Sequence, residues 1–150
     1  MGLVSPRRGA RGGAGEHLTG YGRVPAMTNP AIVARLYSDD NGDTHFEDVE
    51  IRMSAVQYAP PAPAVDLSDP LTATRVTWFR FPAGWSDDAH PSPRRQLFVV
   101  LAGHVEGWTS TGDTRCLGAG QCLLMEDTTG KGHGARPLDG EASAIVIALE

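Results

Sequence analysis

The sequence lacks several features by which protein classes are commonly identified. It contains one lysine and two cysteines in 150 residues. Its longest apolar run, near residues 142–149, has the length of a strand and falls well short of the roughly 18–20 residues that a membrane-spanning helix needs. No segment of about ten or more residues repeats its apolar positions with the 3.6-residue period of a helix. These absences argue against membrane helices and favour an all-β fold class.

The two cysteines, Cys116 and Cys122, have no second pair, which excludes a four-cysteine zinc site. Reduced, buried thiols are the usual state of cysteine in cytosolic proteins. We therefore interpret both residues as reduced and expect a cytoplasmic protein. A disulfide between them, formed in an oxidising compartment, is the alternative.

The charge is unevenly distributed along the chain. Four arginines against one acid, Glu16, give residues 1–26 a net charge of +3, whereas the whole chain carries −5. The remaining residues therefore carry about −8. Nucleic-acid binding needs a concentrated basic face. The acidic remainder therefore argues against nucleic acid as the partner, and no membrane partner is expected.

The N-terminal stretch is rich in glycine and arginine and has no apolar segment that resembles the core of a signal peptide. Such a composition buries too little apolar surface to offset the entropy of ordering it. We expect residues 1–28 to be a disordered leader, with a nucleic-acid-binding tail as the alternative, and Met27 is a second candidate start of the natural chain. Residues 29–150 are expected to form a single domain.

Strand-like runs separated by turn residues follow from Ala31 onward. The proline-rich stretch 58–65 suits only an edge or an extended connector. Many short strands in so short a chain predict a sandwich or a barrel. The expected strands span 31–37, 44–53 and 72–81, a hairpin of 95–103 with 104–112 around Gly103, two short strands within 114–127, and 142–150.

Two segments resemble the paired motifs of the cupins: HPSPRRQLFVVLAGHVEG, residues 90–107, and GAGQCLLMEDTTGKGHGARP, residues 118–137. The first cupin motif has a glycine, His-x-His, an acidic residue and a strand ending in a glycine turn. The second has a glycine turn, a short strand and a loop with one more histidine. The resemblance implies a cupin-like double-stranded β-helix, which is a jelly-roll barrel, and it implies a homodimer.

The matching residues of the first motif are Gly84, His90, Gln96 and Gly103, and those of the second are Gly118 or Gly120 and His133. Ser92 stands where cupins have their second histidine, and Gln96 stands in place of the acidic ligand. The resemblance implies a metal site made of His90, Gln96 and His133. Imidazole nitrogen with an amide oxygen suits a borderline divalent ion such as Zn, Fe, Mn or Ni.

Further candidates surround this set. His45 is a third imidazole or a general base if its strand lines the same cavity with Phe46 facing outward. Strand alternation directs either Arg94 or Arg95 inward, where a guanidinium would bind a carboxylate or enolate. The candidate catalytic residues are His45, His90, His133 and Arg94. For each of them, a solvated or backbone-bonded surface role is the alternative.

The glycine-rich segment EDTTGKGHG, residues 126–134, is not a phosphate-binding loop of the Walker type. That motif needs glycine where Met125 stands and Ser or Thr where Gly132 stands. The segment is better interpreted as a loop that delivers His133 to a cavity. Asp127 is interpreted as a solvated partner of Lys131, with orientation of His133 as the alternative.

These residues indicate an enzyme that acts on a small organic molecule inside the barrel. Metal-assisted isomerase, cyclase, lyase or dioxygenase chemistry is expected, because a bound ion would polarise a carbonyl or enolate. A metal-free cupin using histidine and arginine for acid–base catalysis is one alternative. A non-catalytic domain that binds a small molecule is another. The richness in alanine, glycine, arginine and proline is compatible with a bacterial source.

Overall fold

The structure, a computed structural model, describes residues 3–4 and 30–150. The leader expected over residues 1–28 lies outside the described residues, apart from residues 3–4. The chain forms two compact units: unit 1 contains Met1–Ile32 and Val49–Leu71, and unit 2 contains Val33–Asp48 and Thr72–Glu150. The single domain over residues 29–150 stays a prediction.

The all-β fold class is confirmed for the described residues, which form strands and no helix. No helix long and apolar enough to cross a membrane occurs among them. The strands are β1 (Leu3–Val4), β2 (Ala31–Ser38), β3 (Thr44–Ile51), β4 (Ser54–Val56), β5 (Val65–Leu67), β6 (Ala73–Phe81), β7 (Gln96–Thr109), β8 (Thr114–Gly118), β9 (Cys122–Met125) and β10 (His133–Leu149).

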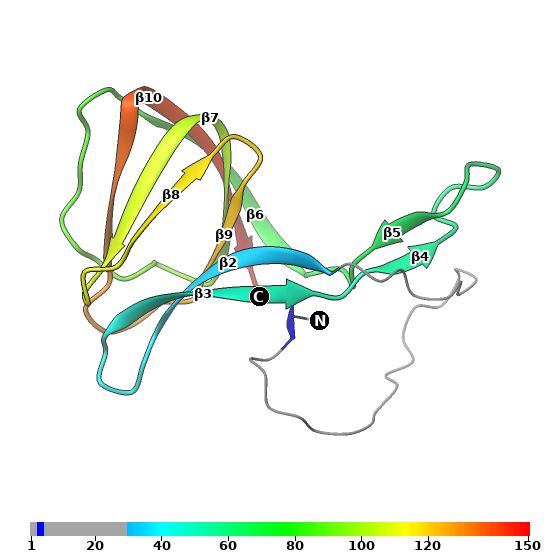
Figure 1. The fold of residues 1–150 in the computed structure, drawn as a ribbon, viewed down its shortest axis with the longest axis horizontal. Helices are drawn as coiled ribbons and strands as arrows, with labels where there is room; N and C mark the ends of the chain where they lie inside the picture. Colours follow the sequence, from blue (N-terminus) through cyan, green and yellow to red (C-terminus); the bar gives the residue numbers. More distant parts are fainter. Residues whose placement is uncertain (1–2, 5–29) are drawn as a thin grey trace. The chain divides into compact units, whose positions relative to one another are not determined.

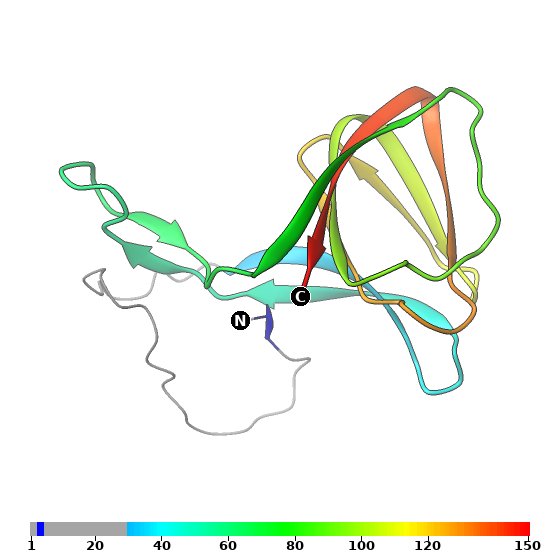
Figure 2. The ribbon, with the colours of Figure 1, turned by 180° about the vertical axis from the view of Figure 1, so that it is seen from behind.

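The strands of unit 2, together with β1, belong to one mixed sheet. The strands of the main sheet follow the order β1-β3-β2-β9-β7-β10-β6, and β8 pairs with β7. All of the pairs that involve β7 or β10 are antiparallel, whereas β2 and β9 run parallel. The long strands β7 and β10 curve together with β6 and β8 around a common interior (Figures 1 and 2).

The predicted hairpin around Gly103 is wrong, because β7 runs through this position as one strand. Gly103 has a φ of +74°, and the register with β10 jumps from the pair Leu138–His104 to the pair Ser143–Ala102. The extra residues on β10 form a bulge that bends both strands. The bend lets two long strands supply both ends of the barrel, and the turn that ends β7 falls at residues 110–113.

The core of unit 2 is made by the inner faces of these strands. Side chains on β10 alternate between the two faces, as in any strand. The alternation buries the small side chains of Ala142 and Ala144 together with Val146. The buried cluster contains Ala34, Leu36, Phe81, Phe98, Val100, Val105, Leu117, Leu123, Met125, Ala142, Ala144 and Val146.

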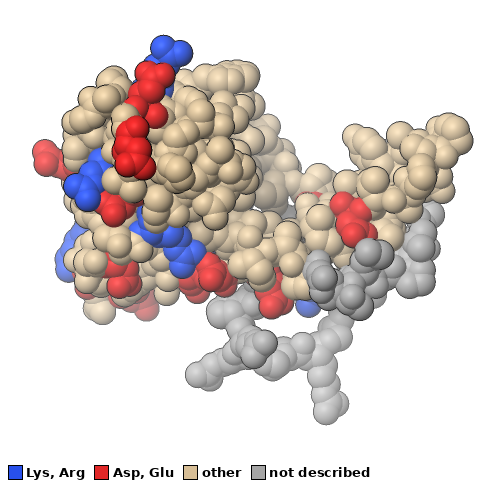
Figure 3. Space-filling view, turned by 45° about the horizontal axis from the view of Figure 1, so that its top comes forward, with Lys and Arg blue, Asp and Glu red and all other residues tan. Residues whose placement is uncertain are grey.

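An ion-pair network ties β2, β3 and the chain after β9 together. Arg35 pairs with both Glu47 and Glu126, and Arg95 also donates to Glu126. Burial alone would raise the pKa of Glu126, but the hydrogen bonds from Arg95 and Arg35 outweigh it and lower that pKa. On the face of the molecule shown in Figure 3, acidic and basic groups likewise lie next to one another.

Unit 1 contains a small hairpin of β4 and β5, which pair antiparallel from Ser54–Leu67 to Val56–Val65. The proline-rich stretch 58–65 forms the loop of this hairpin and ends where β5 begins. The prediction of an edge strand or an extended connector is corrected, because the stretch turns at residues 60–61. β1 pairs antiparallel with the end of β3.

Gly103→Ala is expected to destabilise unit 2 more than Gly84→Ala. Both glycines have a φ near +75°, so each substitution carries the same backbone strain of about 1–2 kcal/mol. A Cβ at Gly103 would also lie 2.6 Å from the Glu141 carbonyl oxygen, whereas one at Gly84 meets nothing within 4 Å. Overpacking adds about 1–3 kcal/mol. Chemical denaturation of both variants measures the difference, and equal losses would contradict the bend described here.

Candidate functional site

The loop that delivers His133 owes its glycines to close backbone approaches. A Cβ on Gly132 would lie 2.0 Å from the His90 carbonyl carbon, and one on Gly130 would lie 2.6 Å from the Gly42 carbonyl oxygen. Both residues have φ values that favour glycine. The buried Thr44 hydroxyl donates to the Gly132 carbonyl at 2.7 Å. The glycines therefore let the loop lie flat against β3 and against the chain at His90.

The two motif histidines lie side by side. His90 and His133 exchange two backbone hydrogen bonds of 3.0 Å each, in an antiparallel bridge. Their ring centroids are 5.1 Å apart. The structure therefore brings together the two histidines that are 43 positions apart in the sequence.

A buried carboxylate orients His133. Asp127 is 0% exposed and His133 is 6% exposed. Asp127 Oδ2 lies 2.6 Å from His133 Nδ1, while Asp127 Oδ1 accepts a 2.7 Å hydrogen bond from the Ser92 hydroxyl. Because a carboxylate only accepts, His133 donates from Nδ1, and Nε2 is left as the ring nitrogen for other partners.

This arrangement corrects the interpretation of Asp127 and Lys131 as a solvated pair. Lys131 instead pairs with Asp43, at 2.6 Å. The hydrogen bond from Lys131 lowers the pKa of Asp43. Asp127, by contrast, has the orienting role that was the alternative reading of the sequence.

His90 is held differently, with both of its ring nitrogens against oxygen acceptors. Nδ1 lies 3.0 Å from the Pro91 carbonyl and Nε2 lies 2.8 Å from Asp87 Oδ2. Neither oxygen can donate, so the arrangement is satisfied in full only by the imidazolium. The Pro91 hydrogen bond and, after it, the Asp87 hydrogen bond raise the pKa of His90 against the opposing effect of burial.

As its ring is arranged, the predicted ligand His90 does not fit a metal ion. A ligand must offer a lone pair, yet both His90 nitrogens face acceptors. Gln96 donates from Nε2 to Met125 Sδ at 3.6 Å, which leaves the carbonyl oxygen on which the prediction depended, so a metal site on these residues stays a prediction. His133 Nε2 is left as the nitrogen donor of the set. Among the described residues, no three or more His, Cys, Asp or Glu side chains gather in a metal-binding group.

The barrel of unit 2 encloses a cavity of about 460 Å³, a size typical of small-molecule sites. Its polar lining includes Asp87, His90, Gln96, Arg115 and His133. The apolar lining combines the aromatic side chains of Phe46, Phe79, Phe81, Trp85 and Phe98 with aliphatic ones such as Leu36 and Leu123. Histidine and carboxylate side chains therefore lie at the wall of a mainly apolar cavity.

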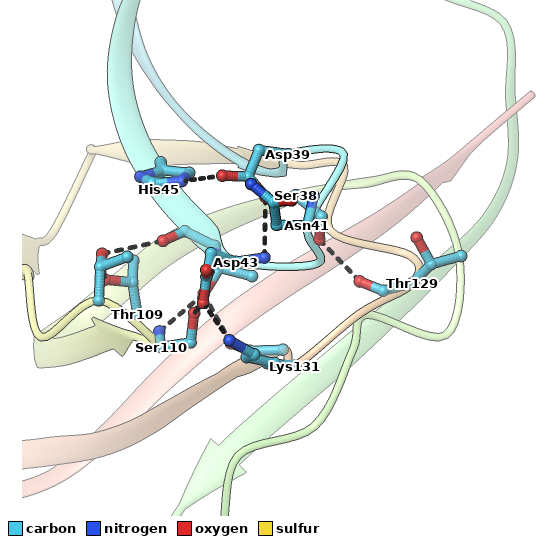
Figure 4. Close-up of polar contacts among 12 residues, drawn as sticks. Ser38, Asp39, Asn41, Asp43, His45, Thr109, Ser110, Thr129 and Lys131 are labelled. Carbon is cyan, nitrogen blue, oxygen red and sulfur yellow. Dashed lines mark hydrogen bonds and ion pairs between the residues drawn. The ribbon is translucent and has the colours of Figure 1, made fainter.

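The expected inward orientation of His45 is corrected by the alternation of β3. Thr44 is buried and Phe46 lines the cavity, so His45 between them faces the other side. Figure 4 shows His45 beside Asp39, with Nε2 and Oδ2 2.9 Å apart. His45 caps the turn between β2 and β3, and its hydrogen bond lowers the pKa of Asp39.

The expected inward arginine of the 94–95 pair is also corrected. Arg94 is exposed, and Arg95 is tied to Glu126. Both residues precede β7, and neither lines the cavity. Arg115 on β8 lines it instead, and sequence reasoning missed this residue. The pattern Arg115-Cys-Leu117 held a signal, because alternation places the arginine on the same face as a buried leucine.

Comparison with known proteins gives likenesses of fold. No family model matches the chain, and no curated protein sequence matches it. One similar solved structure is the Drosophila melanogaster CENP-C cumin domain, with 13% identity and a TM-score of 0.39 over 76% of this chain and 71% of that one. A second is the ethanolamine utilization protein EutQ from Salmonella typhimurium LT2, with 13% identity and a TM-score of 0.38 over 81% of this chain and 98% of that one. A third is the Schizosaccharomyces pombe Cnp3 cupin domain, with 11% identity and a TM-score of 0.39 over 83% of this chain and 86% of that one. Likenesses at these identities and scores assign no activity, ligand or partner.

Asp87→Asn is expected to lower the pKa of His90. The substitution removes a charge-assisted acceptor that favours the imidazolium. The Pro91 carbonyl remains, so part of the upward shift persists. The measurement is an NMR titration of the His90 ring proton in both proteins. Identical titration midpoints would contradict the pairing of His90 with Asp87.

Proposed function

We propose that the chain is a metal-independent enzyme that moves a proton on a small organic molecule inside the barrel cavity. The observation that carries the proposal is the buried Asp127–His133 pair, which leaves His133 Nε2 as a base at the cavity wall. Isomerisation, cyclisation and lyase reactions all include such a proton transfer. The setting we propose for it is the cytoplasm.

Each residue has a physical part in this chemistry. The Asp127 carboxylate holds the His133 tautomer whose Nε2 has a lone pair, and it stabilises the imidazolium that forms when Nε2 takes a proton. The Ser92 hydroxyl holds the other carboxylate oxygen. The raised pKa of His90 favours a positive charge about 5.1 Å from the His133 ring, where it would stabilise negative charge developing on the substrate.

The apolar lining supports the same proposal. Apolar walls lower the local polarity and so strengthen the electrostatic interactions inside the cavity. A proton removed by His133 would therefore be held by the His133–Asp127 pair for return to the substrate at a second position. This is the requirement for an isomerase.

The test uses 5-nitrobenzisoxazole, whose isoxazole ring opens when a base removes the proton on carbon 3. The N–O bond breaks as the nitrile forms, and the coloured phenolate product is followed by absorbance. We expect turnover that EDTA leaves unchanged and that His133→Gln lowers by about 10²-fold or more. Asp127→Asn should also lower it, because asparagine can donate to Nδ1 and so select the wrong tautomer.

His104→Gln is the matched control, because His104 is an exposed histidine of the same unit and should leave the rate unchanged. Dependence of the rate on added Zn, Fe, Mn or Ni would favour the metal-assisted alternative. Binding of small molecules by all variants without proton transfer by any would favour a non-catalytic domain.

We also propose that the chain forms a homodimer through the outer face of β6, β10 and β7. Trp78 pairs with Ile145, and Val76 pairs with Ile147, on the face opposite the cavity. Trp78 is 70% exposed and Val76 is 52% exposed. In the described part of the chain β6 has β10 as a neighbour on one side and none on the other. A two-fold interface would join this apolar face to itself.

Trp78→Asp is expected to convert a dimer to a monomer, because it places like charges against each other across the two-fold axis. Analytical ultracentrifugation at several protein concentrations measures the change. Val65→Asp, at an exposed apolar position of unit 1, is the control and should leave the mass unchanged. A wild-type protein that sediments as a monomer would refute the dimer.

A further inference from the structure

Arg115 is the cavity-lining arginine whose side chain faces the interior. It occupies β8 two positions from the buried Leu117, on the same face. Its backbone pairs with Gly107 on β7, which in turn pairs with Ala135 on β10. All three positions line the cavity. Arg80 also borders it, but the rings of Phe79 and Phe81 are 6.0 Å apart on one face, so alternation directs the Arg80 side chain to the other face.

Two neighbours hold the Arg115 guanidinium in place. Its carbon Cζ lies 5.5 Å from the centroid of the Phe46 ring, a cation–π contact. Its Nη1 donates to Asp48 Oδ1 at 2.5 Å.

The remaining edge of the guanidinium is available for a ligand. Nε and Nη2 have no hydrogen-bond partner in the part of the chain that the structure describes, and these two nitrogens form one side of the planar fork. That side matches the two oxygens of a carboxylate, with two parallel N–H···O bonds. The contacts to Phe46 and Asp48 fix the fork before a ligand arrives, which reduces the entropy lost on binding.

The rest of the cavity specifies what the carboxylate is attached to. Five aromatic side chains form part of the chamber wall, and aromatic rings prefer offset or edge-to-face neighbours of the same kind. Arg115 and His133 lie two strands apart and two residues along the sheet, so their Cα atoms are roughly 12 Å apart by strand geometry. A molecule with its carboxylate on Arg115 can therefore present its other end to His133.

We propose that the ligand of this cavity is a small aromatic monocarboxylate, bound by the Nε–Nη2 edge of Arg115 with its ring among the aromatic walls. The inference rests on the proposed function for the role of His133, and it names the substrate class for that site. Arg115 determines specificity, and His133 acts on the far end of the bound molecule.

Calorimetric titration with 3-phenylpropanoate and with its neutral isostere 3-phenylpropanamide tests the proposal on the full chain. We expect the wild-type protein to bind the acid at least tenfold more tightly than the amide. Arg115→Gln should remove this preference and leave the amide affinity unchanged. Arg115→Lys, which keeps the charge but loses the fork, should remove most of it. Arg136→Gln is the matched control, because Arg136 pairs with Glu106 and does not line the cavity, and it should retain the preference.

Equal affinity for acid and amide in the wild-type protein, or an unchanged acid affinity in Arg115→Gln and Arg115→Lys, would overturn the proposal. The melting temperature of each variant reports whether it has folded. Failure of the proposed function has a different signature. His133→Gln would then transfer protons at the wild-type rate while Arg115 still selected the acid.

Discussion

The two backbone hydrogen bonds between His90 and His133 are the constraint on which the candidate site depends. They join the irregular chain before β7 to the first residue of β10, and they form only because Gly132 has no side chain to push against the His90 carbonyl. Backbone bonds of this kind place two imidazoles side by side whatever their protonation states. The different chemistry of the two rings then comes from what surrounds them.

Those surroundings favour a neutral base at His133 and a cation at His90. His133 faces a carboxylate on one nitrogen and the cavity with the rest of its ring, whereas His90 faces acceptors on both nitrogens. Asp127 is fully buried, and a buried carboxylate is costly unless hydrogen bonds satisfy it. Ser92 and His133 supply these bonds. Ser92 thus supports the carboxylate through its hydroxyl.

Much of the architecture was predictable because it follows from local rules. Alternating apolar residues predicted β2, β3 and β6 nearly in full, and Gly118 and Gly120 marked the turn between β8 and β9. The bend at Gly103 was not predictable as a bend. A glycine with positive φ serves equally in a hairpin turn and in a bulge, and the partner strand β10 decides between them. The prediction that His45 faces inward failed for a related reason. The sequence shows the period of a strand, whereas packing decides which face of the strand meets the core.

By itself, the sequence determined the all-β class, the strand periods, the glycine-rich loop and the two candidate histidines. Each of these depends on a local pattern of residues close together in the chain. Tertiary structure alone decided that Asp127 is buried against His133, that Asp87 holds His90 and that Arg115 rather than Arg94 lines the cavity. Asp127 and His133 are only six positions apart, and Asp87 and His90 only three. The burial and the ring orientations that give these groups their chemistry nevertheless arise only when distant segments pair and the barrel closes.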